Sequence, residues 1–178
     1  NVCGEIGRGL LVLMGIEQGD GMDQVNLLAP KLLKLRLWPD LKDQTKQWVS
    51  SVVDNGYELL VVSQFTLFAT FKKPKPDFHQ AMGGDAAQEL YEAFVQKLRT
   101  EGPPKAVQTG VFGAMMQVNL CNDGPVTVEL VSSPSASSPS TTPTPKGVSA
   151  SPAAGVKGLE LEKNEKSLAQ QPYLGGFF

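Results

Sequence analysis

The fold of this chain is decided by one stretch, Leu59-Leu60-Val61-Val62-Ser63-Gln64-Phe65-Thr66-Leu67. Its first four residues are apolar, as in a buried strand, and polar Ser63, Gln64 and Thr66 follow where such a strand reaches the surface. Strand ends are common places for functional groups on α/β scaffolds. We therefore predict a central strand over Tyr57 to Leu67 with a site at its end.

Hydrophobic patterns on both sides of this stretch predict the other elements. Pro30 falls inside the first expected helix and should kink it or split it in two. Strands at both ends of the chain with two helices between them predict an α/β domain with mixed or antiparallel pairing. The expected elements are a strand over Gly9 to Ile16, helices over Met22 to Leu35 and Asp85 to Arg99, and strands over Ala114 to Cys121 and Val126 to Val131.

Composition divides the chain at about Ser132. Residues 1–131 contain the apolar residues needed for one folded domain, whereas 132–178 form a low-complexity tail rich in Ser, Pro, Thr and Ala. Such a tail has too little to bury to offset the entropy of ordering, so we expect it to be disordered. The chain begins with Asn1 directly before an expected strand, which suggests a fragment of a longer protein. The sequence therefore leaves open whether a segment for organellar targeting precedes it.

Charge and cysteine usage narrow the functional classes. The formal net charge is -2, so any contact with nucleic acid must be a local patch. Cys3 and Cys121 have no metal-ligand spacing and form no disulfide framework, and we expect reduced thiols, an intracellular location, no metal and no cofactor. No apolar stretch approaches the ~20 residues that a membrane-spanning helix needs, so we expect no membrane contact.

The single histidine, His79, is a weak candidate for catalysis. A triad would need His79 beside Ser63 or Thr66, with Asp77 orienting the imidazole. Asp77 and His79 alternate along the chain and leave this arrangement open. A solvent-facing or packing histidine is the favoured interpretation.

Two further segments are candidate binding sites. The first is a basic cluster with two aromatic neighbours, Lys72, Lys73 and Lys75 with Phe71 and Phe78. It is typical of a surface that binds a phosphate backbone and stacks a single-stranded end, and equally of an ordinary solvated loop. The segment Phe112-Gly113-Ala114-Met115-Met116 is more typical of strand and core, although Gly113 and Ala114 could leave space for a small ligand between Phe112 and Met116.

Several spaced motifs resemble those of the D-aminoacyl-tRNA deacylases, from about Val2 to Ser132. They include Ile6-Gly7-Arg8-Gly9-Leu10, Val62-Ser63-Gln64-Phe65-Thr66-Leu67, Pro76-Asp77-Phe78-His79, Phe112-Gly113-Ala114 and Asn122-Asp123-Gly124-Pro125-Val126-Thr127. The resemblance implies a three-layer β/α/β fold with two main helices, and it implies hydrolysis of the ester that joins a D-amino acid, or glycine, to tRNA. The family's opening strand, with its Gln-Arg-Val-type segment, is absent here, and we expect a looser site as a result.

In such enzymes main-chain groups of the Ser-Gln-x-Thr segment bind substrate and stabilise the oxyanion. By resemblance, Gln64 positions the substrate, the Phe65 amide is the oxyanion donor, and Thr66 orients the site, with Ser63 beside them. A nucleophilic Thr66 is the less favoured alternative. The 2′-hydroxyl of the terminal adenosine is thought to assist, so no side-chain base is required.

The resemblance also implies a homodimer. Gly124-Pro125 is expected to be cis and to enter the partner's site, where backbone carbonyls exclude L-amino acids. Phe112, Ala114 and Met116 become expected walls of the adenosine and aminoacyl pocket, and the lysines contact RNA. Two rivals remain: a related deacylase with relaxed chirality, and a non-catalytic nucleic-acid-binding dimer linked to DNA replication. The expected location is the cytoplasm.

Overall fold

The computed structural model describes residues 1–102 and 106–132, all within the first of two units into which the chain divides, Asn1–Ser137. The expected disordered tail, apart from Ser132 itself, lies outside the described residues. The elements in chain order are strand β1 (Gly9–Met14), helix α1 (Met22–Leu33), strands β2 (Arg36–Trp38), β3 (Ser50–Ser51) and β4 (Glu58–Ser63), the 3-10 turn η1 (Phe65–Phe68), helix α2 (Gly84–Glu101) and strand β5 (Val107–Thr109). None of the described helices is long and apolar enough to cross a membrane.

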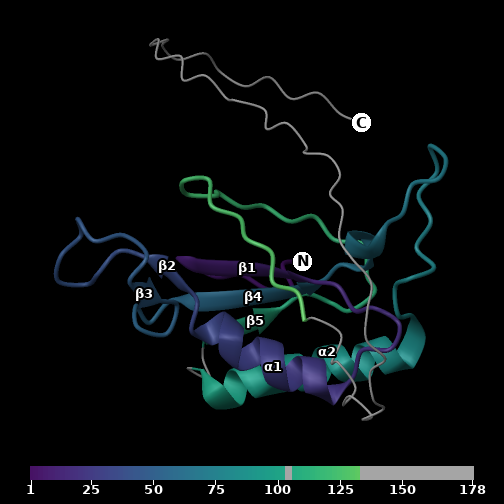
Figure 1. Cartoon of the computed structure of the whole chain (residues 1–178), viewed down its shortest axis with the longest axis horizontal. Helices are drawn as coiled ribbons and strands as arrows, with labels where there is room; N and C mark the ends of the chain where they lie inside the picture. Colours follow the sequence, from purple (N-terminus) through teal and green to yellow (C-terminus); the bar gives the residue numbers. More distant parts are fainter. Residues whose placement is uncertain (103–105, 133–178) are drawn as a thin grey trace, which may run out of the picture. The chain divides into compact units, whose positions relative to one another are not determined.

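The principal sheet is parallel, with β4 between β1 and β5, and β2 pairs with β3 in a separate antiparallel ladder. This confirms the expected α/β class with two helices. Figure 1 shows α1 and α2 on one side of the three-stranded sheet, and the segment that follows β5 runs back on the other side. A parallel pair needs a crossover connection, and α1, β2 and β3 all lie between β1 and β4.

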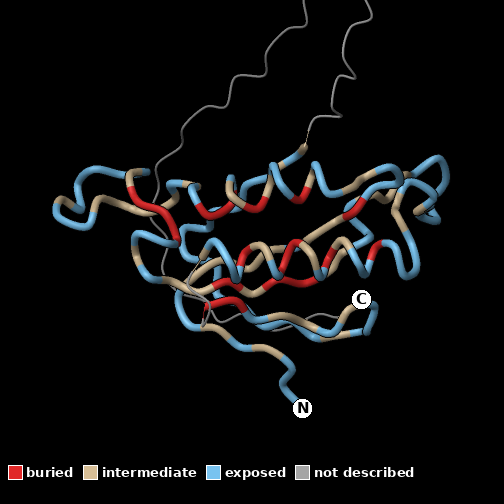
Figure 2. The backbone as a smooth tube through the Cα atoms, turned by 90° about the horizontal axis from the view of Figure 1, so that it is seen from below, coloured by how far each residue is buried: buried red, intermediate tan, exposed pale blue. Residues whose placement is uncertain are grey.

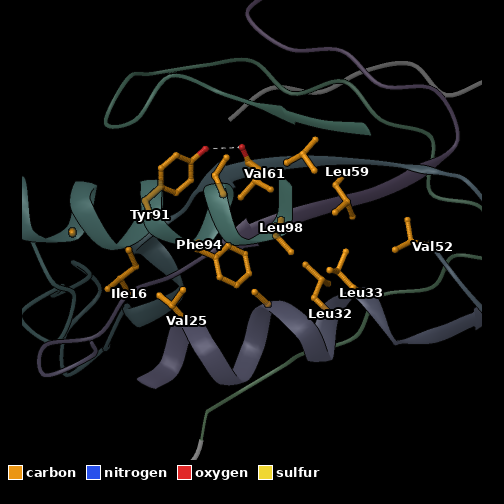
Figure 3. Close-up of a cluster of buried hydrophobic side chains, with 14 residues drawn as sticks. Ile16, Val25, Leu32, Leu33, Val52, Leu59, Val61, Tyr91, Phe94 and Leu98 are labelled. Atoms are coloured by element: carbon orange, nitrogen blue, oxygen red, sulfur yellow. Dashed lines mark hydrogen bonds between the residues drawn. The ribbon is translucent and has the colours of Figure 1, made fainter. Parts of the chain in front are cut away.

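The core lies between the two helices and the sheet. Figure 2 shows the buried positions as short patches along the helices and the central strand, as expected for elements that each bury one face. Alternate residues of β4, Leu59 and Val61, are fully buried and face the helices. Figure 3 shows them with their neighbours; the cluster includes Val25, Leu32 and Leu33 of α1 and Tyr91, Phe94 and Leu98 of α2.

A buried hydrogen bond joins α2 to the central strand. The Tyr91 hydroxyl donates to the Val61 carbonyl at 2.8 Å, drawn as a dashed line in Figure 3. The same carbonyl accepts the Gly110 N–H at 3.0 Å. Burial raises the pKa of Tyr91, which keeps the hydroxyl protonated as the donor.

Three sequence predictions about elements were wrong in whole or in part. The strand expected over Tyr57 to Leu67 ends at Ser63, because the chain turns into η1. The helix with Pro30 is not split: α1 is continuous, and the missing Pro30 N–H affects one carbonyl, that of exposed Asn26, which water can satisfy.

The third concerns the two strands expected around Gly124-Pro125. Residues 114–121 and 126–131 form no strand in the described part of the chain, because no neighbouring backbone pairs with them there. Alternation of apolar residues is compatible with a strand, but a strand also requires a paired neighbour. The short strand β5, by contrast, was not anticipated from the sequence.

Replacing Tyr91 by Phe tests the bond between α2 and β4. We expect Tyr91→Phe to lower the free energy of unfolding by about 0.5–1.5 kcal/mol, because a buried hydrogen bond is lost while the Val61 carbonyl keeps one partner. Urea unfolding measures this. The control is Tyr57→Phe, whose hydroxyl makes no hydrogen bond within the described residues, and an equal loss in both variants would contradict the expectation.

Candidate active site

The candidate site begins where β1 and β4 end together. In their parallel register Met14 pairs with Ser63, so both strands finish at the same edge of the sheet. The Gln64 N–H then donates to the Met14 carbonyl at 2.8 Å, and the chain enters η1. Three of the four predicted catalytic residues, Gln64, Phe65 and Thr66, therefore lie just beyond a strand end, as the sequence indicated.

Main-chain donors are available at the start of η1. The first N–H groups of a helical turn have no partner inside the turn. Here the Leu67 N–H is the first to bond within the turn, to the Gln64 carbonyl at 3.3 Å. This leaves the N–H groups of Phe65 and Thr66 unused by the turn, which is the kind of arrangement that can bind a developing oxyanion.

Side chains in this segment orient one another. The Gln64 carboxamide donates to the Thr66 hydroxyl, which fixes both groups at the surface. The Phe65 side chain is exposed and packs edge-to-face on Phe78, with ring centroids 4.9 Å apart. No carboxylate or imidazole bonds to Ser63 or Thr66 within the described part of the chain.

His79 is committed to another partner. The ring Nδ1 of His79 lies 2.9 Å from Asp77 Oδ2, and the backbone N–H of His79 donates to Asp77 Oδ1 at 3.0 Å. That N–H bond and the imidazole hold the pKa of Asp77 below its usual value, so the carboxylate persists to lower pH. The Asp77–His79 half of a triad is present, but the structure does not bring it to Ser63 or Thr66.

The basic cluster lies on a loop that leaves η1. Thr70 and Asp77 pair as an isolated antiparallel bridge, with reciprocal N–H···O bonds of 2.8 and 2.9 Å. The loop between them projects from the body of the protein in Figure 1 and exposes Lys72, Lys73 and Lys75. The predicted basic patch is therefore accessible and adjacent to the 63–66 segment.

The predicted pocket walls are only partly assembled. Phe112 packs on Tyr91, with ring centroids 5.4 Å apart, and lines a shallow hollow of about 580 Å³ between α2 and the end of β5. Met116 lies beside Gly110, close to Val62, and its Sδ accepts the Val111 N–H at 3.3 Å. Ala114 is exposed and lines neither this hollow nor a second one of about 390 Å³ near Lys34 and Arg36.

Gly124-Pro125 forms a turn with its own internal support. The peptide bond is cis, and Gly124 has φ +129°, a conformation that favours glycine. Asn122 accepts the Val126 N–H on Oδ1 at 3.1 Å and donates from Nδ2 to the Thr127 hydroxyl at 3.0 Å. This clamp was missed in the sequence, although Asn commonly closes turns in this way.

The Gly-Pro turn and the 63–66 segment lie at opposite ends of β1. Asp123 pairs with Arg8, just before β1 begins, at 3.7 Å, whereas Gln64 bonds to Met14 at its last residue. Six residues of strand separate these ends by about 16 Å at the usual rise per residue. In Figure 1 the green turn and the short teal turn η1 lie toward opposite ends of the sheet. Within one chain, the two motifs therefore do not meet.

No group of three or more His, Cys, Asp or Glu side chains could hold a metal ion among the residues that the structure describes.

Comparison with known proteins identifies the family. The family model described as D-Tyr-tRNA(Tyr) deacylase matches residues 1–131, and the chain belongs to that family. A D-aminoacyl-tRNA deacylase of Yarrowia lipolytica is 48% identical over 130 residues, which cover 72% of this chain and 84% of the relative. D-aminoacyl-tRNA deacylase 1 of Mus musculus is 46% identical over 127 residues, 71% of this chain, but the match spans 60% of that relative's length.

A solved structure is also similar. That of "c-Myc DNA Unwinding Element Binding Protein" is 46% identical with a TM-score of 0.67, and the match covers 71% of this chain and 84% of that one. The similarity supports the α/β architecture described above.

Replacing Asn122 tests its role in the Gly-Pro turn. We expect Asn122→Ala to accelerate hydrogen exchange of the Val126 amide by about 2- to 10-fold, the effect of losing one ordinary hydrogen bond. Asn122→Asp keeps the oxygen acceptor and loses only the donor to Thr127, so exchange should change less. Equal protection of Val126 in all three proteins would show that the clamp does not hold the turn.

Proposed function

We propose that this protein hydrolyses the ester bond of D-aminoacyl-tRNA, and of tRNA mischarged with glycine, as a chiral proofreading enzyme in the cytoplasm. The observation that carries the proposal is the similarity over residues 1–131 to relatives named D-aminoacyl-tRNA deacylase, 46–48% identical in the two cases given. The proposal needs neither a metal nor an organic cofactor.

The proposed mechanism relies on the main chain. An aminoacyl ester is already activated, so orienting water and stabilising the oxyanion account for much of the catalysis. The unused N–H groups of Phe65 and Thr66 support an oxyanion site at the start of η1. Gln64 positions the substrate, and its bond to Thr66 keeps the carboxamide in one orientation. The terminal 2′-hydroxyl of the tRNA assists proton transfer.

Chiral selection is assigned to a second copy of the chain. We place Gly124-Pro125 of one subunit in the site of its partner, where its carbonyls exclude the side chain of an L-amino acid. The separation of the two motifs within one chain supports this arrangement, because a single chain cannot complete the site. Phe112, Ala114 and Met116 then line the adenosine and aminoacyl pocket.

The lysine loop is assigned to the RNA. Lys72, Lys73 and Lys75 are exposed beside the 63–66 segment, where they can contact phosphates near the tRNA 3′ end. The proposed complete fold has three β/α/β layers and includes the family's first strand. We also propose that the catalytic domain ends at residue 131 and that 132–178 form a separate tail.

Binding of duplex DNA is a second candidate function. It is favoured by the 46% identity to the structure named c-Myc DNA Unwinding Element Binding Protein. The net charge of -2 argues against strong duplex affinity. Salt distinguishes the candidates, because duplex binding through phosphates weakens steeply as salt rises, whereas ester turnover depends on chirality.

The deciding experiment compares hydrolysis of D-Tyr-tRNA with that of L-Tyr-tRNA by this chain and by a version that carries the family's first strand. We expect rapid loss of the D-ester alone, with a slower or less selective reaction for this chain. Gly124→Ala should change the ratio of D to L turnover, since its added methyl would lie 2.8 Å from the Val126 side chain and distort the turn. Intact D- and L-esters after incubation with both proteins would refute the enzymatic proposal.

A second variant separates an orienting threonine from a nucleophilic one. Thr66→Ala should lower kcat by roughly 2- to 10-fold, because one hydrogen bond to Gln64 is lost while the backbone donors remain. Thr66→Ser keeps the hydroxyl and should turn over at nearly the normal rate. Complete loss of turnover in Thr66→Ala with substrate binding intact would instead identify Thr66 as the nucleophile.

A further inference from the structure

Phe78 contacts the residue whose amide is the proposed oxyanion donor. Its ring packs against Phe65 in an edge-to-face arrangement, with centroids 4.9 Å apart and an interplanar angle of 74°. Phe65 is 56% exposed, and this is its one aromatic contact among the described residues. An exposed aromatic ring held by a single ring neighbour depends on that neighbour for its orientation.

The backbone of Phe78 is anchored on both sides. On its amino side, Asp77 pairs with Thr70 in the bridge that closes the lysine loop. On its carboxyl side, the chain pairs with the segment that follows β1. The Gln18 N–H donates to the Gln80 carbonyl at 2.9 Å, and the Met82 N–H donates to the Ile16 carbonyl at 2.8 Å. The backbone around Phe78 is therefore anchored by these hydrogen bonds, whereas the exposed Phe65 ring depends on its contact with the Phe78 ring.

The turn η1 is also supported by the end of β1 and by the residue that follows it. A Cβ added at Gly15 would lie 2.8 Å from the Phe68 ring and 3.2 Å from the Leu67 Cβ, so η1 packs closely on the chain just after β1. The Gln64 N–H bond to Met14 fixes the start of the same turn. Strand β1 thus supports one side of η1, and Phe78 supports the Phe65 side.

We propose that Phe78 is a positioning residue for the hydrolysis. Its ring holds Phe65, and with it the Phe65 N–H, in the orientation that the oxyanion requires. Phe78 itself does not touch the substrate. This inference rests on the proposed function, because it assigns the Phe65 amide to the oxyanion site.

The kinetic signature of such a residue is specific. An oxyanion donor acts where charge develops in the transition state, so a loosened Phe65 amide lowers kcat and leaves KM nearly unchanged. Loss of one aromatic pair predicts a fall in kcat of roughly 2- to 10-fold. A residue that only bound tRNA would raise KM instead.

The test uses the full chain, three substitutions at Phe78 and one control. Phe78→Ala removes the ring, Phe78→Tyr keeps it, and Phe78→Leu supplies apolar volume without an aromatic edge. Phe71→Ala is the matched control, because Phe71 belongs to the same loop, is 68% exposed and has no aromatic partner among the described residues. Turnover of D-Tyr-tRNA gives kcat and KM, and ¹⁵N relaxation gives the order parameter of the Phe65 amide.

We expect Phe78→Ala to lower kcat, and the Phe65 order parameter to fall from about 0.85 toward 0.6. Phe78→Tyr should match the parent protein in both readouts, and Phe71→Ala should leave the order parameter of the Phe65 amide at its parent value. Phe78→Leu should change both in the same direction as Phe78→Ala, and it decides the matter if Phe78→Ala does not fold. Parent values for Phe78→Ala, or for Phe78→Leu in its place, would overturn the proposal. An equal fall of the Phe65 order parameter in Phe71→Ala would overturn it too.

Failure of the proposed function gives a different result. If the parent protein hydrolyses neither ester, the enzymatic assignment fails while the folded proteins can still be compared by relaxation. A lowered Phe65 order parameter on removal of the Phe78 ring would then support only the structural part of the proposal, that Phe78 holds the Phe65 amide. An unchanged order parameter would overturn that part as well.

Discussion

The Val61 carbonyl is the point on which the rest of the structure depends. Val61 is fully buried in the central strand, and its carbonyl accepts both the Tyr91 hydroxyl of α2 and the Gly110 N–H that follows β5. The Val61 carbonyl therefore joins three parts of the fold: helix α2, the central strand β4 and the segment that follows β5. A buried carbonyl with two donors is costly to disturb, because it would lose partners away from water.

The position of the candidate site follows from that constraint. Leu59 and Val61 must face the helices, which fixes the register of β4 against β1 and the residue at which both strands end. The chain leaves the sheet at Ser63 and turns at once, so the main-chain donors of Phe65 and Thr66 lie at the sheet edge. Their accessibility is therefore a consequence of core packing at Val61, four residues before Phe65.

The Gly-Pro turn is held by a different kind of interaction. Its ion pair, Arg8 with Asp123, is exposed on both sides and contributes little to stability. Asn122, in contrast, bonds to both Val126 and Thr127 and closes the turn on itself. The turn is therefore supported locally, without contact with the 63–66 segment of its own chain, and this supports the proposal that it acts in the site of a second copy.

Sequence reasoning was most reliable where one face of an element is buried. The apolar spacing of α1, α2 and β4 predicted elements that the structure contains, because burial of one face imposes a period on the sequence. It failed at Ala114 to Cys121 and Val126 to Val131, where alternation was present but no neighbouring backbone paired in the described chain. The strand β5 was missed because three residues are too short to show a period.

The sequence by itself determined the class of fold, and it predicted the polar segment at the end of the central strand and the lysine loop that follows, since these depend on local periodicity and residue chemistry. Only the tertiary structure decided that the Asp77–His79 pair makes no bond to Ser63 or Thr66, that Phe78 packs on Phe65, and that Gly124-Pro125 lies at the far end of β1 from Gln64. Each of these depends on which backbone segments pair, and pairing across the chain is set by packing of the core rather than by any short run of residues.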